Sequence, residues 1–186
     1  MTEPEQQDLV DTVIADHRAM TALFDDVEAS GDARHRRELV ERVIVALVGH
    51  SVAEERYLYP TARRVLPDGD EVVEHQLTAH ADAERVMRDL SRTDPADPEF
   101  ARLVHSLIDD VRHHIRAEEG DLLPRLRDAC DAAELGELGR KFEQSKRLAP
   151  TRPHPAAPNQ PPANTILGPG MGLIDRVRDA MTGRTT

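Results

Sequence analysis

The sequence is poor in the residues that characterise small secreted proteins and membrane proteins. It has one cysteine, Cys130, no tryptophan, and only 3% aromatic residues. A single cysteine excludes an intramolecular disulfide framework and is typical of a reducing compartment. No hydrophobic run approaches the roughly 18–20 residues of a membrane-spanning helix, and the acidic N-terminus is unlike a secretory signal. We therefore expect a cytoplasmic protein with an aliphatic core and no transmembrane segment.

Positive charge is also scarce in this chain. Its 24 lysines and arginines are outnumbered by 35 aspartates and glutamates, which gives a net charge of −11. Because nucleic-acid backbones are polyanionic, this charge argues against nucleic acid as a partner. The abundant feature is histidine, of which there are nine. The histidines are therefore the main candidates for functional residues.

The hydrophobic pattern predicts an all-α fold. Apolar residues recur at intervals of three and four, and no stretch shows the alternation that is typical of strands. Four long helices and a short fifth are predicted at residues 6–29, 32–66, 70–92, from a cap at Asp94 or Asp97 to about 128, and 131–147. Pro60 and Pro124 predict bends late in the second and fourth helices. Short connections between long helices favour an up-down-up-down four-helix bundle.

The composition divides the chain into two parts. Residues 1–148 form the predicted bundle, and residues 149–186 form a proline-rich linker followed by a short amphipathic segment. So short a helix is marginal alone, and we expect a weakly ordered tail without separate chemistry. The tail has the pattern of a segment that docks on the bundle, on a partner or on a membrane surface. The sequence does not indicate the oligomeric state.

One eleven-residue pattern occurs twice. Residues 50–60 and 114–124 both read His-x-x-Ala-Glu-Glu-x-x-Leu-x-Pro. Residues four apart share one face of a helix, so His50 lies on the same face as Glu54, and His114 lies on the same face as Glu118. All four lie on apolar stripes, where a carboxylate is costly unless it is paired or bound to metal. One such pair is compatible with a hydrogen-bonded core, whereas two matching pairs suggest facing halves of one site.

The other two long helices each add a histidine in matching register. His17 lies on an apolar stripe 33 residues before His50, and His80 lies on another stripe 34 residues before His114. His75 competes with His80, but its helical neighbours are polar, which indicates a solvated face. Each half of the bundle therefore supplies one histidine followed by a His-x-x-x-Glu pair.

These residue types favour a metal centre. Imidazole with carboxylate suits iron, zinc or manganese, and two histidines with one carboxylate form the open-faced set of non-haem iron. Two such sets in one core predict a dinuclear site in which Glu54 and Glu118 are free to bridge. A ferritin-like di-iron bundle would show Glu-x-x-His, and no glutamate here is followed by histidine at that spacing.

The order His, His-x-x-x-Glu-Glu, His, His-x-x-x-Glu-Glu, with Leu-x-Pro after each glutamate pair, resembles the hemerythrin-like HHE cation-binding family. The resemblance covers roughly residues 8–130. It implies a four-helix bundle with two non-haem iron ions (Fe) as the cofactor. The positions that match the family's metal ligands are His17, His50, Glu54, His80, His114 and Glu118.

The chain departs from the oxygen-carrying hemerythrins at one position. Their third helix has two histidines four residues apart, whereas here Gln76 lies four residues before His80. Either Glu84 fills the missing coordination position or the position is open. This difference argues against reversible oxygen carriage.

The leading functional prediction is a di-iron protein that binds or processes a small oxidant, namely O₂, peroxide or NO. The alternatives are a non-catalytic sensor that signals through its tail and an iron-handling module. Glu55 and Glu119 are predicted to orient ligands or form salt bridges rather than to bind metal. Tyr57, one turn after Glu54, is either a hydrogen-bond donor to a metal-bound group or a plain core residue. His113 is expected at the surface.

Overall fold

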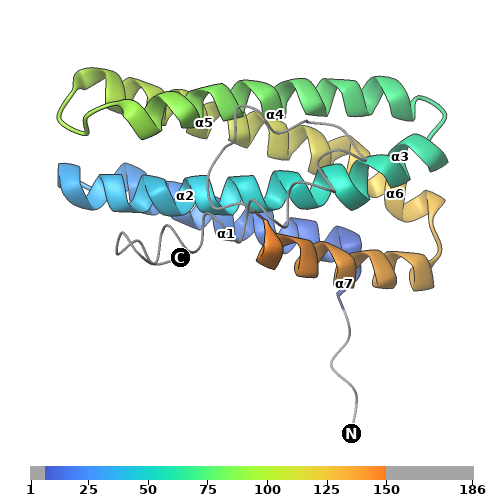
Figure 1. Cartoon of the computed structure of the whole chain (residues 1–186). Helices are drawn as coiled ribbons and strands as arrows, with labels where there is room; N and C mark the ends of the chain where they lie inside the picture. Colours follow the sequence, from blue (N-terminus) through green and yellow to red (C-terminus); the bar gives the residue numbers. More distant parts are fainter. Residues whose placement is uncertain (1–6, 150–186) are drawn as a thin grey trace, which may run out of the picture.

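The computed structural model describes residues 7–149, and all regular structure in this range is helical. Four long antiparallel helical rods lie side by side, and one further helix covers one side of them (Figure 1). The predicted up-down-up-down bundle with a short fifth helix is therefore confirmed. The predicted tail lies outside the described residues except for Ala149. No helix between residues 7 and 149 is long and apolar enough to cross a membrane.

The predicted helix boundaries agree closely with the structure. The helices are α1 (Leu9–Ala29), α2 (Ala33–Ala53), α3 (Tyr59–Val65), α4 (Gly69–Arg92), α5 (Pro98–Ala117), α6 (Leu123–Ala129) and α7 (Ala132–Leu148). Asp8, Asp32, Asp97 and Asp131 cap α1, α2, α5 and α7 by accepting backbone N–H groups of the first turn. Of the two caps proposed for the fourth rod, the chain thus uses Asp97.

The two late prolines each follow a π-helical turn. These turns are η1 (Glu54–Leu58), which joins α2 to α3, and η2 (Glu118–Leu122), which joins α5 to α6. The N–H of Tyr59 bonds to the carbonyl of Glu54, five residues back, instead of the usual four. A π turn holds one extra residue and therefore changes which later residues face the core. Both turns begin at the glutamates of the repeated pattern.

The core consists of two apolar clusters with a polar layer between them. One cluster fills the end of the bundle around Phe24, Leu47, Leu90 and Leu107, and the other surrounds Leu9 at the opposite end. Five buried polar residues of the central layer lie between the apolar segments of their own helices: His17, His50, Glu54, Gln76 and Glu118. Polar side chains from different helices therefore face one another in the middle of the bundle.

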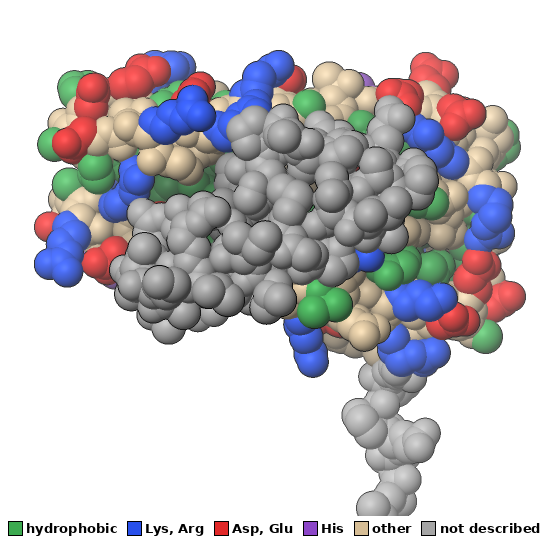
Figure 2. Space-filling view, viewed as in Figure 1, with side chains coloured by type: hydrophobic (Ala, Val, Ile, Leu, Met, Phe, Trp, Pro, Cys, Tyr) green, Lys and Arg blue, Asp and Glu red, His purple; other side chains and the backbone are tan. Residues whose placement is uncertain are grey.

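The surface between residues 7 and 149 mixes charges of both signs. Figure 2 shows acidic and basic side chains interspersed on the visible face, with small apolar areas between them. Many of these charges form ion pairs, for example Arg112 with Glu28 and Arg127 with Asp11. Such exposed pairs contribute little to stability individually.

Candidate metal centre

The six predicted ligand residues converge in the polar layer although they come from all four rods. His17 lies on α1, His50 on α2, His80 on α4 and His114 on α5, and each glutamate opens a π turn. Glu54 and Glu118 are fully buried, and none of the four imidazoles is more than 10% exposed. The structure thus brings all six together.

Their ligand atoms form two overlapping groups. In the first, His17, His50, Glu54 and Glu118 offer nitrogen and oxygen atoms that all lie within 4.8 Å of one another. The second group consists of Glu54, His80 and His114, within the same limit. Glu54 belongs to both groups, so the two groups are joined into one cluster.

Each carboxylate lies between an imidazole of the first half of the bundle (residues 9–65) and one of the second half (residues 69–129). Glu54 Oε1 is 2.9 Å from His50 Nε2, and its Oε2 is 3.2 Å from His80 Nε2. Glu118 Oε2 is 3.5 Å from His17 Nε2 and 3.7 Å from His114 Nε2. Each glutamate thus lies next to imidazoles of both halves, so both carboxylates would be available to hold a bound cation.

The inward-facing atoms fit a bound cation. Five of them are buried and make no hydrogen bond of acceptable geometry: the Nε2 atoms of His17, His50 and His114, Glu54 Oε1, and Glu118 Oε2. Buried polar atoms in proteins are nearly always hydrogen-bonded or bound to a ligand. Nitrogen and oxygen donors at this density provide the coordination that first-row transition metals take.

Three further carboxylates hold the outer nitrogens of the imidazoles. His17 Nδ1 donates to Glu119 at 2.9 Å, and His80 Nδ1 lies 3.2 Å from Glu55. His50 Nδ1 lies 3.1 Å from Asp16. A carboxylate on the far nitrogen fixes the tautomer and the orientation of a metal-binding histidine. The sequence missed Asp16, because it lies on a different helix from His50 and no spacing rule connects them.

The buried charges shift the pKa values of these groups in opposite directions. Burial lowers the pKa of His50, but the charge of Glu54 and the hydrogen bond with Asp16 outweigh it and raise the pKa to about 10. Burial and the charge of His80 lower the pKa of His114 to about 3. Burial and the charge of Glu54 raise the pKa of Glu118 to about 7. Two imidazoles of the same site, His50 and His114, thus differ strongly in pKa.

Tyr59 also reaches the cluster, and the sequence reasoning missed it. Its hydroxyl donates to Glu118 Oε1 at 3.0 Å and lies 2.9 Å from His80 Nε2. Burial and the charges of Glu118 and Glu54 raise the tyrosine pKa well above its usual value, so the hydroxyl stays protonated. Tyr57, the predicted candidate, is only partly buried and lies against Arg56 instead. Pro60 was the available sequence signal, because it marks the irregular turn that changes which tyrosine faces the core.

The remaining candidates lie around the centre. His75 and His113 are exposed, as predicted, while Gln76 is buried at 4% exposure and its Oε1 has no hydrogen-bond partner. Glu84 belongs to neither ligand group. The position that a fifth histidine would take is thus held by an amide.

Comparisons with known proteins agree with this arrangement. The hemerythrin HHE cation-binding domain model matches residues 8–126. An uncharacterized hemerythrin-like protein of Schizosaccharomyces pombe is 27% identical over 172 residues, which cover 92% of this chain and 85% of that protein. A DNA nickase of Nostoc is 26% identical over 145 residues, which cover 78% of this chain but only 41% of the nickase.

A solved structure supports the fold. The crystal structure of a hemerythrin HHE cation-binding domain-containing protein of Mycobacterium kansasii, an Rv2633c homolog, superimposes with a TM-score of 0.65 at 21% identity. The match covers 75% of this chain and 88% of that one. At this identity the likeness concerns the fold alone. Since the family model spans more than half of the sequence, the chain belongs to the hemerythrin HHE cation-binding family and is a metal-binding protein.

Proposed function

We propose that the six converging residues hold two iron ions and that the centre binds or processes a small oxidant, namely O₂, peroxide or NO. The observation that carries this proposal is the pair of ligand groups that share Glu54, with Glu118 between the two halves. Bound iron supplies redox chemistry and open coordination positions for small molecules. No other residue set that the structure describes offers as many buried nitrogen and oxygen donors in one place.

The protein's own residues prepare the centre for this reaction. Asp16, Glu55 and Glu119 orient three of the imidazoles, and the two apolar clusters exclude water from above and below. Tyr59 keeps a proton at the shared edge of the two groups, where it can be donated to a bound oxidant.

The two metal positions differ in how many protein ligands they have. The first group has four residues and the second has three, because Glu118 belongs only to the first. Gln76, at the place of the carriers' fifth histidine, adds no imidazole to the second group. A cation held by Glu54, His80 and His114 would have fewer protein ligands, which would favour consumption of peroxide or NO over reversible O₂ carriage.

Iron quantification with an optical spectrum tests the proposal. We expect about two iron ions per chain, because each half contributes its own set of donors. The reduced protein should then be mixed separately with air, peroxide and NO while the iron-to-ligand absorption bands are followed. Faster consumption of peroxide or NO than by free iron is expected. One zinc ion without iron in protein from iron-replete cells would contradict the metal assignment, and a stable reversible O₂ spectrum would indicate a carrier instead.

One observation favours a metal sensor as the second candidate. Asp16, which holds His50, also pairs with Lys146 of α7, and the Phe142 ring of α7 lies 5.8 Å from the His50 ring. Helix α7 thus contacts the centre, and it ends at Leu148, directly before the predicted tail. Hydrogen exchange of α7 with and without metal tests this candidate, which requires a clear increase in protection on loading.

DNA is not part of the proposed function. The Nostoc relative carries the name of a DNA nickase, but this chain spans less than half of that protein and has a net charge of −11. A polyanionic partner is disfavoured by that charge. Supercoiled plasmid incubated with the iron-loaded chain should remain intact.

A further inference from the structure

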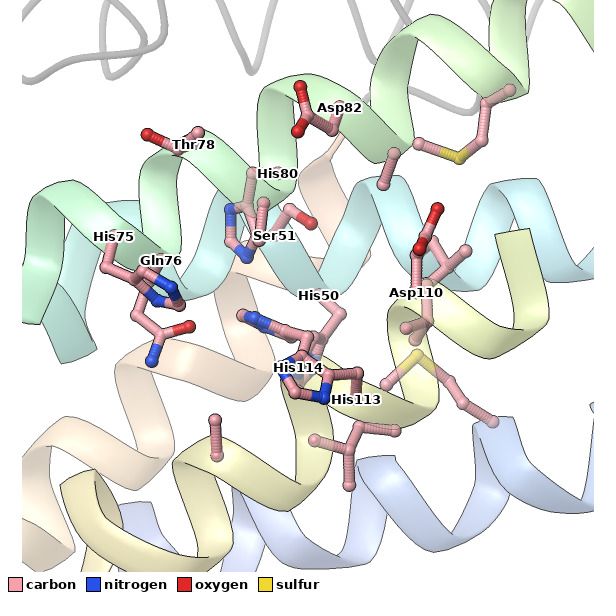
Figure 3. Close-up of a pocket in the computed structure, with 18 residues that line it drawn as sticks. His50, Ser51, His75, Gln76, Thr78, His80, Asp82, Asp110, His113 and His114 are labelled. Atoms are coloured by element: carbon pink, nitrogen blue, oxygen red, sulfur yellow. The ribbon is translucent and has the colours of Figure 1, made fainter. Parts of the chain in front are cut away.

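A pocket of about 270 Å³ lies beside the metal centre, between α4 and α5 with α1 and α2 behind it. His50, His80 and His114 form part of its wall, so the pocket reaches the ligand cluster. Figure 3 shows side chains of α4, such as Gln76 and His80, facing His114 of α5 across this space.

The pocket adjoins one of the two matching histidine pairs of the centre, the pair His80 and His114, although residues of the first half such as His50 also line it. The His17 and His50 rings are 5.0 Å apart at 62°, and the His80 and His114 rings are 5.0 Å apart at 61°. In the first half, the residue before His17 is Asp16, which fills the space at His50 Nδ1. The first half is further closed by two residues of α7, Phe142 and Lys146.

The corresponding position in the second half is an alanine. Ala79 precedes His80 and lines the pocket, and it offers no group to His114. His114 is therefore the one imidazole of the four without a carboxylate at Nδ1, and both of its nitrogens are buried without a hydrogen-bond partner. The exchange of aspartate for alanine thus explains both the space and the unsatisfied histidine.

A second buried polar group in the wall also lacks a partner. The Oε1 atom of Gln76 makes no hydrogen bond, although the residue is only 4% exposed. Leaving such buried groups without a hydrogen bond is unfavourable. A bound molecule with a hydroxyl-like group, which both donates and accepts, would satisfy Gln76 and His114 together.

The other residues that line the pocket indicate the polarity and charge of that molecule. Met20, Leu47, Met87 and Val111 provide an apolar surface, and no lysine or arginine lines the pocket. Asp82 and Asp110 also line the pocket, so a carboxylate or phosphate would meet like charges there instead of a lysine or arginine. A cavity of about 150 Å³ already accommodates a benzene-sized ligand, so this pocket is several times larger than a diatomic oxidant needs.

We propose that this pocket binds a small uncharged organic molecule with one hydroxyl-like group, which contacts Gln76 and His114 while its apolar body packs against the methionines. This binding goes beyond the oxidant chemistry proposed above, because it does not require turnover. It places an organic molecule next to the metal position that has fewer protein ligands.

The test uses the iron-loaded full chain with cyclohexanol as the probe. Paramagnetic iron broadens the NMR lines of molecules held close to it, so the broadening measures binding beside the centre without any reaction. We expect broadening of the cyclohexanol lines and about tenfold weaker binding of cyclohexanecarboxylate, which has the same ring and a negative charge. Gln76→Leu should weaken cyclohexanol binding about fivefold, as expected for one lost hydrogen bond.

Filling variants provide the decisive control. Ala83→Leu places extra volume in the pocket and should abolish the broadening, and Ala79→Val serves if that variant loses iron. Ala19→Leu, at an exposed position on α1, should bind the probe like the wild type. Absence of broadening, equal binding of both probes, or undiminished binding in an iron-containing filling variant overturns the proposal.

The outcome is separable from the proposed function. Consumption of peroxide by a chain that binds no cyclohexanol would overturn only the pocket proposal. Binding of cyclohexanol to an iron-loaded chain that is inert towards O₂, peroxide and NO would support the pocket and contradict the oxidant chemistry.

Discussion

At the residue scale, two histidines of α4 illustrate how five positions along a helix separate a candidate ligand from a surface residue. His80 is 9% exposed and faces Glu54, whereas His75 is exposed. We predict that His80→Ala lowers the iron content, because the second ligand group keeps only Glu54 and His114. His75→Ala should keep its iron. Iron per chain in the two purified variants decides this, and loss with His75→Ala alone would mean that the proposed register is wrong.

Tyr59 and Tyr57 form a similar matched pair. Tyr59→Phe removes the hydroxyl that contacts both Glu118 and His80, while the ring can still fill its place in the core. We expect normal iron content but at least roughly tenfold slower peroxide consumption, because general acid catalysis typically contributes about 10²–10⁴-fold. Stopped-flow absorbance measures the rate. Tyr57→Phe is the control, and an equal effect of both variants would exclude a specific role for Tyr59.

Asp16 tests the importance of the outer carboxylates. Asp16→Asn removes the charge that holds both His50 Nδ1 and Lys146. Loss of such a partner typically weakens metal binding by about 10–100-fold, because the imidazole is less firmly oriented and less basic. We expect this loss in a competition titration against a chelator. Asp82→Asn is a suitable control, because Asp82 is exposed, pairs with Arg85 and belongs to neither ligand group.

At the element scale, α7 depends on a close approach to the start of α1. A Cβ atom at Gly139 would lie 2.9 Å from backbone atoms of Gln7 and Asp8, whereas one at Gly136 would meet nothing within 4 Å. We predict that Gly139→Ala destabilises the protein by about 1–3 kcal/mol through overpacking. Gly136→Ala should be neutral or stabilise by about 0.5–1 kcal/mol, because alanine favours the helix. Urea unfolding of both variants compares them, and equal effects would contradict tight docking of α7.

The π turns show which features of a helix the sequence predicted and which it did not. Pro60 and Pro124 correctly marked an irregularity in the second and fourth rods, since proline cannot continue an ordinary helical ladder. The irregularity is a π turn rather than the simple bend predicted. The prediction also extended α-helical spacing through the turn, which is why Tyr57 was considered instead of Tyr59.

At the scale of the whole molecule, the metal and the fold are expected to be linked. Removing the metal leaves two glutamates and four histidines facing one another at the centre of the bundle. A ligand present at a hundredfold excess over its Kd adds about 2.7 kcal/mol of stability per site. We therefore expect chelation to lower the Tm by at least about 5 °C, given roughly 2–4 °C per kcal/mol for a chain of this size. An unchanged Tm in calorimetry, with metal loss confirmed by elemental analysis, would contradict this link.

The division of the chain at residues 148 and 149 remains a prediction, because the segment beyond Ala149 lies outside the described residues. If the bundle and the tail are separate parts, residues 1–149 should keep the fold and the iron of the full chain.

The sequence by itself determined the helices, their order and the residues that converge. These properties are local, because helical periodicity places His50 with Glu54 and His114 with Glu118 on common faces, and the repeated pattern then relates the two halves. Only the tertiary structure decided which partner each imidazole finds. His50 contacts Asp16, His17 contacts Glu119, and the small side chain of Ala79 leaves space for the pocket. Each of these features involves residues of different helices. No spacing along one chain encodes such contacts, since they depend on how neighbouring helices pack against each other.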